Sequence, residues 1–201
     1  MTSTDDTPAT RRGPTLPSHR LPPLPGHTAL PAQHRAEAPT GLERFNSLPA
    51  DDARRALLSC CHSLSWVRRI AEHRPYPDLD SLLAAADEAA YDLTPADLAE
   101  ALAGESLTLL PDGAYSAAHT ALSAAHAAYE SRFGHVFVIC LDEVAPEEAA
   151  DQVLAAIRSR LTNDREEERL LAAEELRRLA RGRLTRLVRD FSDLRSVERA
   201  L

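Results

Sequence analysis

The sequence contains no lysine, since all 23 basic residues among its 201 positions are arginine. Aromatic residues are also few, at 4% of the chain. No apolar run approaches the about 18 residues that a membrane-spanning helix needs, and no apolar export signal opens the chain. The only cysteines, Cys60, Cys61 and Cys140, lack metal-ligand spacing, and their odd number leaves no complete disulfide framework. These scarcities predict a cytoplasmic protein with reduced thiols, no structural metal and no membrane segment.

The formal net charge of −8 is divided unevenly along the chain. Residues 1–40 carry four arginines against three acids, a charge of +1, and the remainder carries 19 arginines against 28 acids, a charge of −9. An acidic body argues against nucleic acid as a partner. The exclusive use of arginine is typical of the coding bias of a GC-rich genome and indicates no function.

The first 40 residues differ in composition from the rest. They hold eight of the 14 prolines, interleaved with threonine, serine and histidine. Such a segment buries little apolar surface, so we expect residues 1–40 to form a disordered tail. Its PPLP pattern is a linker or, alternatively, a ligand for an aromatic groove. Residues 41–201 are then one domain, and an apolar content of 44% is enough for a core.

Helix signals dominate from residue 41 onward and predict an all-α bundle of about seven or eight helices. Ser63 is a predicted N-cap, and Thr94 followed by Pro95 predicts a helix that Gly104 ends. Residues 164–191 place acids early and arginines late, the charge order that complements a helix dipole. Their leucines recur at helical spacing and predict one apolar stripe. The run HVFVICL is either a buried helix or an extended segment that crosses the core.

Four segments in register resemble one enzyme family. They are FNSLP at 45–49, CHSLSWVRRIAEHRPYP at 61–77, YESRFGHVFVICL at 129–141 and RSRLTND at 158–164. Together they resemble the 2-oxo-4-hydroxy-4-carboxy-5-ureidoimidazoline (OHCU) decarboxylases of urate degradation. The resemblance implies a helical, homodimeric, cofactor-free enzyme that converts OHCU to S-allantoin.

Decarboxylation of this small anionic ring needs a cation, a group that moves a proton, and donors for developing negative charge. By resemblance, Arg160 is the cation, since its guanidinium can grip a carboxylate through two hydrogen bonds. Asn163 places that guanidinium or caps the last helix. The resemblance also implies contacts from the backbone of Val136, Phe137, Val138 and Ile139.

The family's proton-handling segment differs here. The family histidine aligns with Glu105, and its acidic partner aligns with His119. The two residues are therefore predicted as a transposed catalytic pair, although surface residues without a role would give the same pattern. Two further alternatives remain open: a family member that only binds a ligand or a partner, and an enzyme for another small anionic substrate. The remaining histidines form no cluster with metal-ligand spacing.

Overall fold

The computed structural model describes residues 39–105 and 117–198, and these residues contain eight α-helices and no strand. The helices are α1 (Gly41–Ser47), α2 (Ala50–Leu58), α3 (Leu64–Glu72), α4 (Leu79–Tyr91), α5 (Pro95–Ala103), α6 (Ala117–Phe133), α7 (Ala149–Arg160) and α8 (Arg165–Glu198). The prediction of an all-α bundle of seven or eight helices is confirmed. Residues 1–38 of the predicted tail lie outside the described residues, and Thr40 is the N-cap of α1. No described helix is long and apolar enough to cross a membrane.

Local capping chemistry sets several helix ends. Ser63 accepts a hydrogen bond from the backbone of Trp66 at the start of α3, as predicted. Thr94 forms a capping box with Asp97 ahead of Pro95, and Gly104 ends α5, also as predicted. In the resulting arrangement, α3 packs against both α2 and α4.

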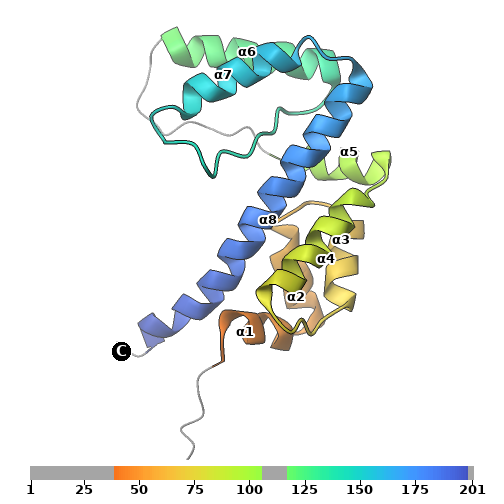
Figure 1. Ribbon diagram of the computed structural model, residues 1–201, viewed down its shortest axis with the longest axis vertical. Coiled ribbons are helices and arrows are strands. Elements are labelled where there is room, and N and C mark those ends of the chain that lie inside the picture. The colour runs from red at the N-terminus through yellow and green to blue at the C-terminus, as the bar shows by residue number, and fades with distance from the viewer. Residues whose placement is uncertain (1–38, 106–116, 199–201) are drawn as a thin grey trace, which may run out of the picture. The chain divides into compact units, whose positions relative to one another are not determined.

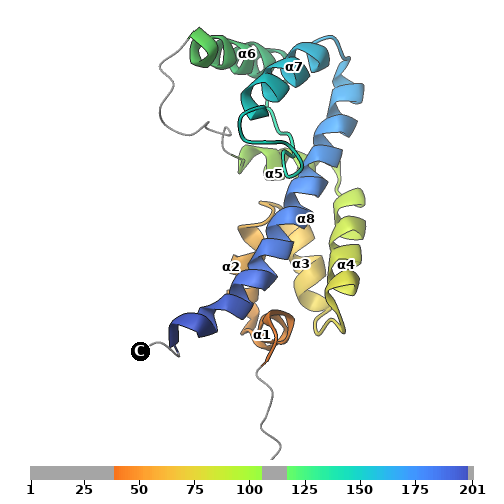
Figure 2. The ribbon, with the colours of Figure 1, turned by 60° about the vertical axis from the view of Figure 1, so that its left-hand side comes forward.

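The long helix α8 organises the fold, because α1 and α4 both pack on it. Figures 1 and 2 show α8 running along the first helices, with α6 and α7 at the end where α8 begins. Of the predicted apolar stripe, Leu170 and Leu171 are 57% and 44% exposed, so the other helices of the chain do not cover that part. The buried face instead uses small residues at two points, which let neighbouring helices approach closely. It consists of Ala172, Leu176, Ala180, Leu184 and Val188.

The HVFVICL run crosses the core as an extended segment, one of the two forms predicted for it. Gly134 ends α6 with a φ of 83°, a conformation that favours glycine, and residues 136–141 are neither helix nor strand. Successive side chains of an extended chain point to opposite sides. Accordingly, Phe137 packs in the cluster formed by α6 and α7, whereas Val138 belongs to the larger cluster around α8. The segment therefore joins the two parts of the core.

Candidate functional site

A buried ion pair joins the end of α7 to the start of α8. Arg160 is 8% exposed and Glu168 is fully buried. The Nε and Nη2 groups of Arg160 donate to Oε1 of Glu168 at 2.9 and 2.5 Å. Its Nη1 donates to the backbone carbonyl of Val138 at 2.8 Å. Arg160 therefore ties the extended segment to both helices.

Three further groups complete this Arg160 cluster. The hydroxyl of Tyr129 donates to Glu168, and Nδ2 of Asn163 donates to the other oxygen of that carboxylate at 3.0 Å. Burial, reinforced by the neighbouring Glu168, raises the pKa of Tyr129, so the phenol keeps the proton that it donates. The ring of Phe137 lies under the guanidinium of Arg160, 4.6 Å from ring centre to Cζ.

The structure thus brings together Arg160, Asn163, Phe137 and Val138, four of the residues predicted for the site. Sequence reasoning missed the acid at the centre of the cluster. Glu168 is one of several acids at the start of α8, and only its complete burial distinguishes it from its neighbours. Ile139 is partly buried and packs against the α6–α7 cluster.

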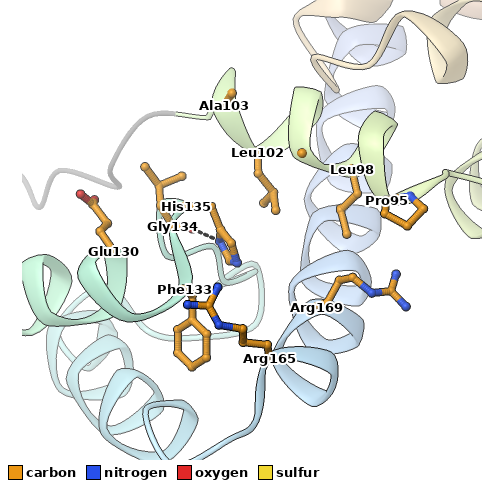
Figure 3. A pocket seen from close by; sticks show the side chains of 12 residues that line it. Pro95, Leu98, Leu102, Ala103, Glu130, Phe133, Gly134, His135, Arg165 and Arg169 are labelled. Atoms are coloured by element: carbon orange, nitrogen blue, oxygen red, sulfur yellow. Dashed lines mark hydrogen bonds between the residues drawn. The ribbon is translucent and has the colours of Figure 1, made fainter.

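An open pocket of about 650 Å³ lies between α5, the end of α6 and the start of α8. Its volume is in the range of sites for small molecules. The walls are apolar and the rim is polar (Figure 3). Apolar walls come from Pro95, Leu98, Ala99, Leu102, Ala103, Phe133 and Val136; Gly134 and the polar residues Glu130, His135, Arg165 and Arg169 complete the lining. Of the four residues predicted to contact the substrate through their backbone, Val136 lines this pocket.

The polar groups of the rim carry positive charge and one imidazole. Arg165 and Arg169 lie four residues apart, on one face of α8, and Figure 3 shows Arg165 extending toward the end of α6. Arg169 also pairs with Glu166, through Nε and Oε2 at 2.9 Å. Nδ1 of His135 lies 3.0 Å from the carbonyl oxygen of Val136. Because a carbonyl can only accept, this nitrogen carries the proton, and Nε2 of the neutral ring has the lone pair.

The residues of the predicted catalytic pair have different surroundings. Glu105 follows α5, its side chain is 5% exposed, and both its oxygens accept from Arg183, at 2.6 and 2.8 Å. These hydrogen bonds raise the pKa of Arg183. Glu105 does not line the pocket described above. His119 lies in the first turn of α6, and its side chain is outside the described part of the chain. The pair therefore stays a prediction.

Over the described ranges, 39–105 and 117–198, no group of three or more histidine, cysteine, aspartate or glutamate side chains is placed to hold a metal ion. The polar side chains that line the pocket carry imidazole, guanidinium and carboxylate groups.

Comparison with known proteins gives the family. The family model for OHCU decarboxylase matches residues 46–106 and 105–185, which together span most of the described chain. The chain belongs to the OHCU decarboxylase family. Both the Arg160 cluster and the pocket lie inside the matched residues.

Two solved structures are similar in fold. A crystal structure of (S)-allantoin synthase superposes with a TM-score of 0.58 at 20% identity, covering 73% of this chain and 53% of that one. This chain therefore spans about half the length of that protein. A crystal structure of OHCU decarboxylase in the presence of (S)-allantoin gives a TM-score of 0.57 at 19% identity, covering 65% of this chain and 95% of that one. No curated protein matches the sequence.

Proposed function

We propose that the pocket between α5, α6 and α8 binds OHCU and that the protein removes its carboxylate as carbon dioxide, giving S-allantoin. The observation that carries the proposal is the composition of the pocket, an apolar slot with Arg165, Arg169 and His135 at its rim, inside residues that match the family. An apolar slot suits a flat ring, and the positive charge of Arg165 and Arg169 suits its carboxylate. In Figure 3 the guanidinium of Arg165 points toward His135 and that of Arg169 points away from it.

The reaction needs no cofactor, because the substrate provides its own electron sink. The bond between the ring carbon and the carboxylate breaks, and its electron pair forms a double bond to the neighbouring ring carbon. The electron pair of the adjacent carbon–nitrogen double bond moves onto the nitrogen. The hydroxyl on the first carbon then loses its proton and becomes a carbonyl, while the neighbouring carbon gains a proton. One proton is taken up overall. The protein must hold the carboxylate, exclude water from one face of the ring, and deliver a proton to one side only.

Under the proposal, Arg160 supports this chemistry by holding the pocket wall. It fixes the carbonyl of Val138, and through the extended backbone it positions Val136 in that wall. Its hydrogen bonds to Glu168, Val138 and Tyr129 use four of its five N–H groups, and Arg160 itself does not line the pocket.

The test uses OHCU generated freshly from urate and follows the optical activity of the product. Spontaneous decarboxylation gives racemic allantoin, because a planar carbon in solution is protonated on both faces. We expect the protein to produce S-allantoin faster than the background. Racemic product at the background rate would refute the proposal.

A matched pair of variants examines the pocket itself. Removing two charge-assisted contacts should raise KM at least about 10-fold in Arg165→Ala/Arg169→Ala. Arg178→Ala is the control, since Arg178 lies on the same helix, pairs with Glu174 and does not line the pocket. Equal KM values in the two variants would exclude the rim arginines from substrate binding.

We also propose that the protein is a cytoplasmic homodimer, as its family resemblance implies. Tyr91 of α4 and Leu170 and Leu171 of α8 are large apolar side chains that a second subunit could cover. Light scattering should give twice the mass of the chain, and Leu170→Asp should lower that mass. A monomer at micromolar concentration would refute this part.

A further inference from the structure

We propose that His135 is the group that transfers the proton in this pocket. This inference rests on the proposed decarboxylation and names the residue that performs its proton step. His135 is the one histidine among the residues that line the pocket. The family's histidine position is occupied by Glu105, whose carboxylate is held by Arg183 away from the lining.

The backbone directs His135 to the pocket. With a φ of 83°, Gly134 ends α6 and turns the chain, so the next residue leaves the helix. A side chain at position 134 would strain this turn, since other residues rarely adopt a positive φ. His135 lines the pocket beside Phe133 and Val136 (Figure 3).

The ring of His135 is held in one orientation. Its ring is T-shaped to that of Tyr129, at a centroid distance of 5.6 Å and an interplanar angle of 77°, and the ring of Phe133 lies at 6.4 Å. Tyr129 is itself fixed by Glu168 and Arg160. The Arg160 cluster therefore forms the rigid support behind the imidazole, as a catalytic group requires.

The hydrogen bond to Val136 selects the tautomer that can act as a base. Nδ1 donates to the carbonyl, which leaves the lone pair on Nε2. The charged side chains that line the pocket with His135 are Glu130, Arg165 and Arg169.

The proton step balances without an added reagent. Nε2 takes the proton of the substrate hydroxyl as carbon dioxide departs, so an O–H bond breaks and an N–H bond forms. The imidazolium then returns this proton to the adjacent ring carbon, which restores the neutral His135. The ring nitrogen that received the electron pair takes the remaining proton from solvent. Delivery from one fixed imidazole accounts for a single enantiomer.

The test compares His135→Asn with the wild type in the decarboxylation assay. Asparagine keeps a donor near the Val136 carbonyl and removes Nε2. We expect kcat to fall about 100- to 10,000-fold, the usual range for general acid–base help. KM should change little, since the rim arginines remain. The control is His73→Asn, because His73 also contacts a backbone carbonyl through Nδ1 but is exposed at the C-cap of α3 and lies outside the pocket.

Two further measurements separate catalysis from a structural role. Imidazole added to His135→Gly should restore part of the rate, and the limb of the wild-type pH–rate profile between about pH 5 and 8, where histidines titrate, should vanish in His135→Asn. If the wild type is active and both variants keep its kcat, only the role of His135 is overturned. A folded variant with reduced kcat but no rescue by imidazole would also overturn that role. An inactive wild type would overturn both the proposed function and this inference.

Discussion

Replacing Arg160 by alanine tests the structural and the functional reading of the site at once. From sequence alone, the variant is expected to lose ligand binding and to keep its fold. The structure changes the second expectation, because Glu168 is fully buried and two of its hydrogen bonds come from Arg160. In the variant, this carboxylate retains only the neutral donors of Tyr129 and Asn163. We therefore expect a large loss of stability.

The size of the loss follows from the burial of the pair. Removing one partner of a buried ion pair costs about 3–5 kcal/mol, because the other charge is left uncompensated. Domains are stable by only about 5–15 kcal/mol, so the variant should lose roughly a fifth or more of its stability. For a chain of this length, about 2–4 °C per kcal/mol predicts a melting temperature lower by roughly 6–20 °C.

Urea unfolding of three variants measures this reasoning. Arg160→Ala should show the full loss. The double variant Arg160→Met/Glu168→Leu should recover much of it, since no buried charge remains, although the hydroxyl of Tyr129 loses its acceptor. Arg169→Ala is the matched control, since its pair with Glu166 faces water and its loss should change stability far less than the loss of Arg160.

The result that would refute this reasoning is a loss below about 1 kcal/mol in Arg160→Ala, the value typical of an exposed pair. Ligand affinity is measured separately, at a temperature where the variant is folded. We expect it to fall more than about 10-fold, which corresponds to 1.4 kcal/mol. Unchanged affinity in the folded variant would remove Arg160 from the site and leave its role purely structural.

Three other predictions follow from the described contacts. If Glu105 and His119 form the transposed pair, Glu105→Gln and His119→Ala should each lower kcat about 100-fold or more. If both variants instead keep the kcat of the wild type, His135 is favoured as the proton-transfer group. Burial lowers the pKa of His126, whose ring nitrogens have no partner among the described residues, below its ordinary value of 6.5. Because the folded protein resists protonation of this ring, the associated stability is present above pH 6.5 and is lost as pH falls through the folded-state pKa. His126→Leu should therefore lose less stability in acid than the wild type. Equal pH dependence of the two proteins would contradict this prediction. Burial raises the pKa of Cys60 to about 11 and that of Cys61 to about 12, so both thiols should resist alkylation at pH 8 until urea unfolds the protein. The free energy of unfolding should also decline as pH rises from the ordinary thiol pKa of 9.0 toward about 11. Rapid alkylation of the native thiols would show that they are not buried.

The fold could be predicted well where its signals are local. Ser63, Thr94 and Gly104 mark helix ends because each satisfies backbone groups within its own turn, and no other part of the chain is needed. The apolar face of α8 was predicted less well. Leu170 and Leu171 fit the helical spacing, but which residues of a stripe are covered depends on where the neighbouring helices end.

The Arg160 cluster could be predicted only in part. The family resemblance placed Arg160, Asn163 and Val138 in one site, and the structure brings them together around Glu168. The acid itself carries no sequence signal that separates it from the other acids at the start of α8. Its role depends on a tertiary contact, since the end of α7 folds back on α8 and buries one carboxylate out of several.

Arg165 is the residue of the pocket for which a sequence signal did exist. A cation in the first turn of a helix opposes the helix dipole, and the run of acids that follows, Glu166 to Glu168, has the favourable sign. A charge that is locally unfavourable is retained when something else uses it, and such departures from local rules gather at functional sites. In the structure Arg165 lines the pocket with Arg169 and His135. Local pattern alone would assign Arg169 to a solvated helix face and His135 to a core segment. The unfavourable placement of Arg165 is therefore best explained by an anion that the pocket binds. Arg165→Glu suits the helix dipole better but should not bind the substrate. Substrate binding by this variant would contradict the explanation.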